Sequence, residues 1–314
     1  MRTQIQRRTY GSAGLLIALL AISAGLALVR PNFLTVANGV NLIRQISING
    51  ILAVGVTYVL LTGGVDLSLG SLVALAGVVA AHCAHPGQAP VVTPVLAGVA
   101  VGAACGAASG AVVTRGKVAP FVVTLGMMTV ARGLALVLSG GRPVSNLSRE
   151  FTWMGSGDIA GLPYPALILA VVAVASHIVL QKMRLGRYLY AVGGNERAAL
   201  ASGIDAAAIK LFAYTVCGGL AGLAGVVLAS RITTGQPNAG VGYELDAIAA
   251  AVIGGTSLAG GVGGVGGAIL GALLMGVINN GLDLLNVSSY YQQIVKGLII
   301  VGAVLLDRRQ GEAS

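Results

Sequence analysis

Long apolar runs without charged residues alternate with short polar turns along the whole chain. A helix that crosses a lipid bilayer needs about 20 mostly apolar residues. The pattern therefore predicts about ten membrane-spanning helices, some of them short or broken. The predicted spans are residues 11–29, 46–65, two within 66–115 on either side of a turn at 85–87, 118–138, 162–180, 211–230, 247–257, 265–278 and 289–306.

Two of these spans, 247–257 and 265–278, are short and are joined by glycines. Helices of this kind can stop inside the membrane, so we expect broken or re-entrant segments here. The first span, 11–29, has the character of a signal peptide, but it lacks a clear small-x-small cleavage site and further spans follow it. We therefore expect an uncleaved anchor.

The basic residues predict the orientation, because Lys and Arg in short loops favour the cytoplasm. With the N-terminus inside, twelve of them fall in cytoplasmic segments and five on the opposite side. The cytoplasmic set is Arg2, Arg7, Arg8, Arg115, Lys117, Lys182, Arg184, Arg187, Arg197, Lys210, Arg308 and Arg309. Both termini are therefore expected to be cytoplasmic.

Composition supports a membrane location. Hydrophobic residues make up 56% of the 314 positions and charged residues 9%, whereas a soluble domain carries about 25% charged residues. The chain is expected to be an all-α integral membrane protein, with one transmembrane domain over residues 1–314 surrounded by membrane lipid. The net charge is +9, but the basic residues stand singly at the ends of apolar runs, so we expect no nucleic-acid binding.

Motifs for catalysis are missing from the sequence. It contains no Gly-rich loop ending in Gly-Lys-Ser/Thr, so the chain is not expected to hydrolyse ATP by itself. Cys83, Cys105 and Cys217 are widely spaced among apolar residues, which is typical of packing residues rather than of a metal site. We therefore expect a protein without a catalytic site, a cofactor or a metal.

Glycines occur at helical spacing within several apolar runs. Four-residue steps separate Gly98, Gly102, Gly106 and Gly110, and the pairs Gly218 with Gly222 and Gly267 with Gly271. Small residues in such ladders let helix backbones approach closely in lipid. The ladders predict close packing, either inside one bundle or at a subunit interface.

Polar residues inside apolar segments are the candidates for a pathway, because they are costly in a membrane. Asp66 and Ser68 lie in a glycine-containing break between two spans, where they could cap the next helix or line a conduit. Asn279 and Asn280 follow an apolar run and could line a passage or cross-link helices. Thr124 is a further candidate. The spans hold no stacked carboxylates, which disfavours a carrier driven by an ion gradient.

The longest predicted cytoplasmic segment covers residues 181–210. Asn195 can cap a short helix with Glu196 in its first turn, and Gly203 can end it. The small side chains at 198, 199 and 201 would suit close docking into a groove of a partner protein.

This segment resembles the coupling loop of ABC importer permeases. Their Glu-Ala-Ala-x-x-x-Gly pattern corresponds to Arg197-Ala198-Ala199-x-x-x-Gly203, with the arginine variant of sugar-type permeases. The ranges that resemble the ribose-type permease subunit of carbohydrate ABC importers, within the branched binding-protein-dependent transport permease family, are 62–71, 119–126, 186–204, 236–260 and 279–307, with 287–296 especially similar.

The resemblance implies a permease in the bacterial inner membrane that translocates a monosaccharide, most closely ribose. It implies a periplasmic sugar-binding protein, an ATP-binding cassette subunit and a second permease subunit, most simply a homodimer, as partners. It also implies an ATPase-coupling loop formed by Gly194, Asn195, Glu196, Arg197, Ala198, Ala199 and Gly203. An ion-gradient-driven sugar carrier and a membrane scaffold remain alternatives, as do xylose, galactose, a signalling sugar or a nucleoside as the substrate.

Overall fold

The computed structural model describes residues 2–87 and 89–312. Residues 1, 88, 313 and 314 of the predicted domain lie outside this description, as do the side chains of residues 1–13 and 303–314. The described chain is helical apart from its turns and one small hairpin. The helices are α1 (Arg2–Val29), the 3-10 helix η1 (Pro31–Leu34), α2 (Val36–Leu61), α3 (Leu69–Cys83), α4 (Val92–Arg115), α5 (Pro120–Ser139), α6 (Arg149–Ser156), α7 (Tyr164–Lys182), α8 (Arg184–Gly194), α9 (Glu196–Ala201), α10 (Ala206–Ile232), α11 (Tyr243–Ile253), α12 (Val265–Leu284) and α13 (Ser289–Glu312). Strands β1 (Asp158–Ile159) and β2 (Leu162–Pro163) pair antiparallel between α6 and α7.

Six helices among the described residues are long and apolar enough to cross a membrane, namely α2, α4, α5, α7, α10 and α12. Two shorter apolar helices are α3 and the part of α1 from Gly14 to Val29. The protein is therefore an all-α, multi-pass membrane protein. The segment expected at 247–257 is α11, and its 11 residues extend only about 16 Å, which is too short for a crossing.

Two predicted spans are longer in the structure. The span expected at 265–278 is the 20-residue α12, which continues through Asn279 and Asn280 because both amides bond to neighbouring helices. The second span begins at Val36 rather than at residue 46. Its Arg44 does not end the helix, because the guanidinium group donates to the carbonyl oxygen of Ser156.

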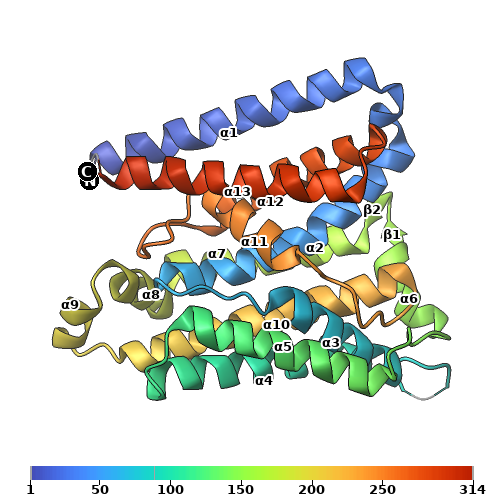
Figure 1. Ribbon diagram of the computed structural model, residues 1–314, viewed down its shortest axis with the longest axis horizontal. Helices are drawn as coiled ribbons and strands as arrows, with labels where there is room; N and C mark the ends of the chain where they lie inside the picture. Colours follow the sequence, from blue (N-terminus) through green and yellow to red (C-terminus); the bar gives the residue numbers. More distant parts are fainter. Residues whose placement is uncertain (1, 88, 313–314) are drawn as a thin grey trace.

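The helices run side by side, with α10 and α2 at the centre of the bundle (Figure 1). α10 packs against α4, α3 and α2, while α2 also contacts α12, α11 and α7. Figure 1 places α8 and α9 at one end of the molecule together with both chain ends, and α6 with the β-hairpin at the other end. We call these the α9 end and the α6 end.

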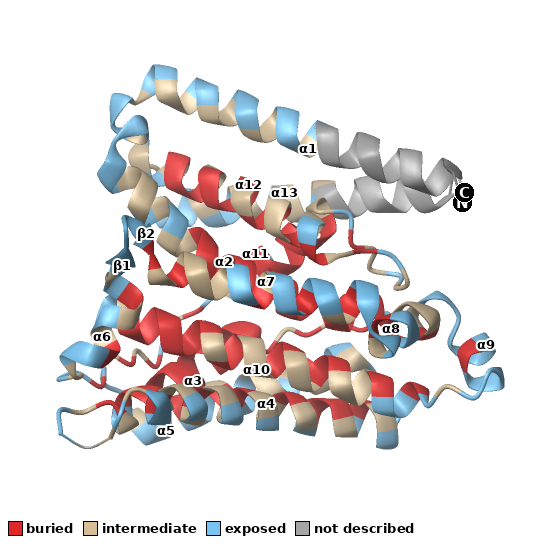
Figure 2. Ribbon diagram, turned by 180° about the vertical axis from the view of Figure 1, so that it is seen from behind, coloured by how far each residue is buried: buried red, intermediate tan, exposed pale blue. Residues whose placement is uncertain are grey.

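Burial follows this arrangement (Figure 2). In the most apolar stretch of α2, 78% of residues are buried, whereas the corresponding share in α5 is 17% and in α7 is 22%. The outward faces of α5 and α7 are apolar and exposed, as expected for surfaces that face lipid tails.

The glycine ladders lie between helices of one chain. A side chain on Gly102 or Gly106 of α4 would overlap the backbone of α10 at Gly218 or Tyr214, and one on Gly271 of α12 would overlap the carbonyl oxygen of Ala250 in α11. These contacts support packing inside one bundle, and the ladders are therefore not left free for a subunit interface.

Candidate functional site

The first polar centre is the break between α2 and α3. Gly63 has a φ of +75°, a left-handed conformation that favours glycine, and the chain stays non-helical until Ser68. Asp66 is fully buried, and its Oδ1 accepts hydrogen bonds from the Ser68 backbone N–H at 2.9 Å and the Ser68 hydroxyl at 2.6 Å. Asp66 thus holds the turn that leads into α3. Its Oδ2 has no hydrogen-bond partner among the described residues.

Side chains from two further helices meet at the same break. The carbonyl oxygen of Val65 accepts from the Thr124 hydroxyl of α5 at 3.4 Å and from the Tyr214 hydroxyl of α10 at 3.3 Å. The structure therefore brings together three of the five predicted pathway residues, Asp66, Ser68 and Thr124. Tyr214 was missed by sequence reasoning, although a tyrosine hydroxyl within an apolar helix was the available signal.

Asn279 and Asn280 are adjacent in α12 but bond to different helices. Asn280 and Asn38 of α2 form a reciprocal amide pair with N–O distances of 2.8 and 3.0 Å. Asn280 is therefore a cross-link between α12 and α2. Neither asparagine lies at the α2–α3 break.

Asn279 belongs to a second polar centre. Its Nδ2 donates to Oδ2 of Asp246 in α11 at 3.5 Å, and the Lys296 ammonium group of α13 forms an ion pair with the same oxygen at 2.8 Å. We call Asp246, Asn279 and Lys296 the α11 polar cluster. Asp246 was missed by sequence reasoning because it sits at the edge of a short predicted span.

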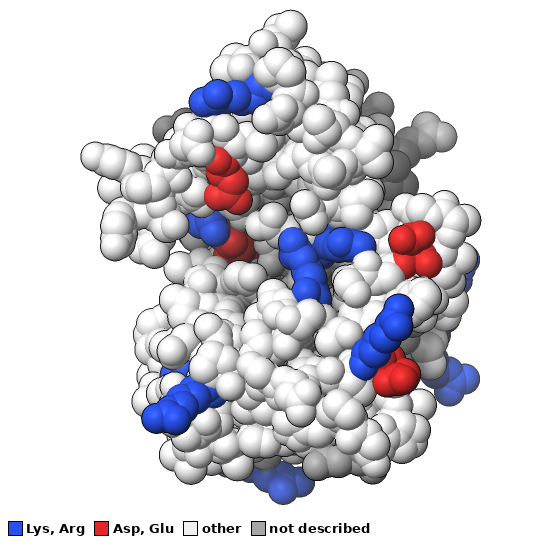
Figure 3. All heavy atoms as spheres, turned by 90° about the vertical axis from the view of Figure 1, so that its right-hand side faces the viewer, with Lys and Arg blue, Asp and Glu red and all other residues white. Residues whose placement is uncertain are grey.

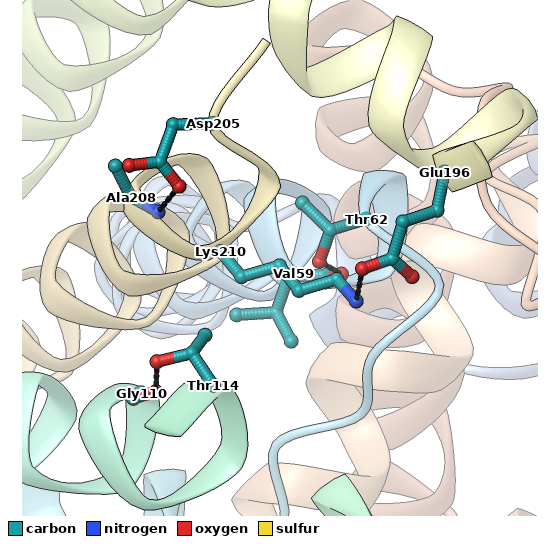
Figure 4. A network of polar contacts seen from close by, with 8 residues as sticks. All are labelled: Val59, Thr62, Gly110, Thr114, Glu196, Asp205, Ala208 and Lys210. Atoms are coloured by element: carbon teal, nitrogen blue, oxygen red, sulfur yellow. Dashed lines mark hydrogen bonds and ion pairs between the residues drawn. The ribbon is translucent and has the colours of Figure 1, made fainter. Parts of the chain in front are cut away.

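The third region is the short helix α9, within the segment predicted as the coupling loop. Asn195 caps α9, since its side chain accepts from the Ala198 backbone N–H at 3.0 Å, and Gly203 follows the helix with a φ of +80°. The Glu196 carboxylate forms an ion pair with Lys210 of α10 at 2.7 Å, and Asp205 caps α10 (Figure 4). These contacts hold α9 against the start of α10.

The predicted docking face of α9 is partly wrong. Ala199 is only 4% exposed and packs into the main hydrophobic core, so it faces the permease itself. Ala198 and Ala201 are exposed, and Leu200 is 54% exposed. One face of the six-residue α9 packs against the rest of the chain. Ala199 belongs to this buried face, whereas Leu200 points outward.

The end of α8 connects α9 to the interior. The Gly261 backbone N–H donates to the carbonyl oxygen of Leu61, the last residue of α2, at 3.0 Å. A side chain on Gly193 of α8 would overlap that same carbonyl. The Tyr190 hydroxyl donates to the Gly263 carbonyl at 3.0 Å. Three backbone segments, from α2, α8 and the α11–α12 loop, thus meet at one junction.

The α6 end carries an open polar depression of about 590 Å³. Its lining is rich in hydroxyl and amide side chains and includes one leucine and one arginine: Ser145, Asn146, Leu147, Arg149, Thr152, Thr233 and Thr234. Figure 3 shows charged side chains at several places on this end of the molecule, some of them next to one another, between larger uncharged areas. Among the residues that the structure describes, no group of His, Cys, Asp or Glu side chains could hold a metal ion.

A bundle of apolar helices with buried polar breaks and a short exposed helix at one end has the features of a membrane transport permease. Comparison with known proteins identifies the family. The family model described as "Branched-chain amino acid transport system / permease component" matches residues 38–304, and the chain belongs to this family.

Several sugar permeases are similar to the chain over most of its length. The ribose import permease protein of Escherichia coli (strain K12) is 48% identical over 299 residues, which cover 94% of this chain and 93% of that protein. The ribose import permease protein of Bacillus subtilis (strain 168) is also 48% identical, over 95% of this chain and 91% of that protein. The D-allose transport system permease protein of Escherichia coli (strain K12) is 39% identical over 95% of this chain and 91% of that protein. No solved structure matches the chain.

Proposed function

We propose that the chain is the transmembrane permease subunit of an ATP-binding-cassette importer and that it translocates ribose. The observation that carries this proposal is the 48% identity, over more than nine tenths of the chain, to the ribose import permeases of Escherichia coli and Bacillus subtilis. The D-allose permease is less similar, at 39%. Ribose is therefore favoured over other monosaccharides, with xylose, galactose, a signalling sugar and a nucleoside as further substrates to test.

The proposed topology has about ten crossings in the bacterial inner membrane, with both termini cytoplasmic, and one crossing is made by the loop 233–242 together with the short α11. Figure 1 supports it, because both chain ends lie at the α9 end, where the basic segment 181–210 is also found. In this orientation the polar depression at the α6 end faces the periplasm, where a sugar-binding protein would deliver its cargo.

The proposed coupling segment is 181–210, with α9 as the part that docks onto the ATP-binding cassette subunit. Its exposed residues around the helix are Gly194, Asn195, Glu196, Arg197, Ala198, Leu200 and Gly203. Closure of the ATPase subunits would move α9 and α8, and the junction of Gly193 with Leu61 and Gly261 would pass this movement to the α2–α3 break. Such rigid-body movements are a common basis for alternating access.

The proposed pathway includes Asp66, Ser68, Thr124 and Asn279. Two copies of the chain would enclose it in a homodimer. The importer then consists of two permease subunits in lipid, two ATPase subunits at the α9 end and one sugar-binding protein at the α6 end.

Reconstitution tests the proposal. The purified permease is placed in liposomes with and without the ATPase subunit, the binding protein and internal ATP, and uptake of labelled ribose is measured. Uptake only with all components supports the importer. Uptake by the permease alone, driven by an ion gradient, would make it a secondary carrier. Uptake of another sugar by the complete system would retain the importer and change its substrate.

A further inference from the structure

The α11 polar cluster lies inside the bundle. The loop before α11 runs inward along α3, since a Cβ built on Gly235 would lie 3.0 Å from the carbonyl oxygen of Gly77, and one built on Gly240 would lie 2.5 Å from that of Gly70. Seven residues of helix separate these two contacts, or about 10 Å. α11 therefore begins inside the bundle rather than at its α6 end.

α11 is a half-length helix whose first turn carries the acidic side chain of the cluster. Asp246 lies in that turn, where the positive end of the helix dipole favours a negative charge. Half-helices that start inside the membrane commonly form parts of substrate and ion sites in transporters. Lys296 lies seven residues into α13, or about 10 Å along it, so the ion pair is also at membrane depth.

Two oxygen atoms of this cluster have no hydrogen-bond partner among the described residues. They are Oδ1 of Asp246 and Oδ1 of Asn279, whose residues are 2% and 4% exposed. The Asn279 amide nitrogen and Oδ2 of Asp246 are 3.5 Å apart, so both unpaired oxygens belong to the same cluster. If the nitrogen and oxygen of the Asn279 amide exchanged places, two acceptor oxygens would face each other at Asp246. The observed orientation, with the nitrogen toward the carboxylate, is therefore the favourable one. Each unpaired buried acceptor is costly, which calls for a donor.

The chemistry of the cluster selects the kind of donor. Both unpaired atoms are acceptors, so an anion does not fit. A metal cation is disfavoured because the Lys296 ammonium group already bonds to the Asp246 carboxylate. Neutral O–H groups, one for each oxygen, satisfy the pair, and a sugar carries several of them. The Lys296 side chain is 26% exposed, so the cluster extends from the buried Asp246 to the protein surface at α13.

We infer that the α11 polar cluster is a transit subsite in which Asp246 and Asn279 accept hydrogen bonds from hydroxyl groups of the sugar. This inference rests on the proposed sugar transport and adds a position along its route. The subsite is closed in this structure, and separation of α13 from α11 during the transport cycle opens it. Lys296 positions the Asp246 carboxylate and completes the set of hydroxyl-binding groups.

The test compares uptake of D-ribose with uptake of 2-deoxy-, 3-deoxy- and 5-deoxy-D-ribose by the reconstituted complete importer. Each rate for Asn279→Ala is divided by the rate of the unaltered importer with the same sugar, which removes the preference of the binding protein. We expect ribose uptake to fall about tenfold or more, because a site built for a hydroxyl loses much when the bond is lost. At least one deoxy sugar should be slowed far less, since it lacks the hydroxyl that made the bond. The double variant Asp246→Leu/Lys296→Met removes both charges together and also the acceptor oxygens of Asp246, and it should show a sugar dependence of the same kind.

Asn280→Ala is the matched control, because it removes a buried amide pair from the next residue of the same helix. Any loss in this variant should be the same for all four sugars. If Asn279→Ala also slows all four sugars by one factor, or slows none, the two oxygens bind only water and the inference is overturned. If the unaltered importer takes up no pentose at all, the proposed function fails instead, and the two failures are thereby distinguished.

Discussion

Gly193, at the end of α8, is the position where an added methyl group should separate ATP hydrolysis from transport. A Cβ built on this residue would overlap the carbonyl oxygen of Leu61 and approach the backbone N–H of Gly261 to 2.6 Å. These atoms belong to backbone, so they cannot rotate away as a flexible side chain would. The substitution Gly193→Ala therefore forces the α8, α2 and α11–α12 segments apart.

The size of the effect follows from packing. Adding a methyl group to a well-packed site costs about 1–3 kcal/mol, and replacing a helical glycine with alanine returns about 0.5–1 kcal/mol. The gain in helix propensity applies to both transport states and cancels between them, whereas the packing cost falls mainly on conformations in which the junction is closed. A shift of about 1–3 kcal/mol between two transport states changes their ratio by about 5–150-fold.

The assay measures labelled ribose uptake and phosphate release from the same proteoliposomes. Gly193→Ala should lower the number of sugars transported per ATP by about fivefold or more, within the range given by that shift. Gly126→Ala is the control, because a methyl group on this exposed α5 glycine meets no atom within 4 Å. Thermal unfolding in detergent, measured for both variants, separates a coupling defect from a folding defect. Equal transport per ATP in the two variants would refute the role of the junction.

Four further substitutions test single contacts. Leu200→Glu should weaken binding of the ATPase subunit in a pull-down and leave the permease folded, because this side chain is 54% exposed. Ala199→Glu should instead lower the melting temperature of the isolated permease, since that residue is buried, and an unchanged melting temperature would contradict the assignment. Asp66→Asn replaces the acceptor of two Ser68 bonds and should cost about 0.5–1.5 kcal/mol of stability, measured by thermal unfolding. Gly102→Val should destabilise the α4–α10 contact by about 1–3 kcal/mol in the same assay, and normal stability would argue against close packing there.

The sequence was sufficient to predict the membrane class and the positions of most long helices, because span length and charge depletion follow directly from the bilayer. It also indicated that Asp66 and Ser68 mark a helix break. The hydrogen-bond partners of polar side chains were harder to predict from the sequence. Asn279 and Asn280 differ by one residue, which is about 100° around a helix, and so face different neighbours that only the tertiary packing defines.

The error at Ala199 has a related cause. α9 has six residues, too few for a hydrophobic period to show which face is buried, and alanine is equally suited to a core or to a docking surface. Asp246 was overlooked because its ion-pair partner lies 50 residues further along the chain, in α13. Contacts between distant helices thus account for most of what the sequence did not predict.

The α11 polar cluster and the coupling junction are connected through α11. The first turn of α11 holds Asp246, and the loop that follows its last turn lies against Gly193 through Gly260 and Gly261. Because α11 is also packed tightly on α12 by Gly271, the two helices should move together when the junction opens. The double variant Gly193→Ala/Asn279→Ala tests this connection. If the junction and the subsite act independently, its loss of ribose uptake equals the product of the two single losses. A clear departure from that product for ribose would show that the two sites are coupled. If the departure is missing for the deoxy sugar whose uptake Asn279→Ala leaves almost unchanged, the movement at α8 reaches the sugar through α11.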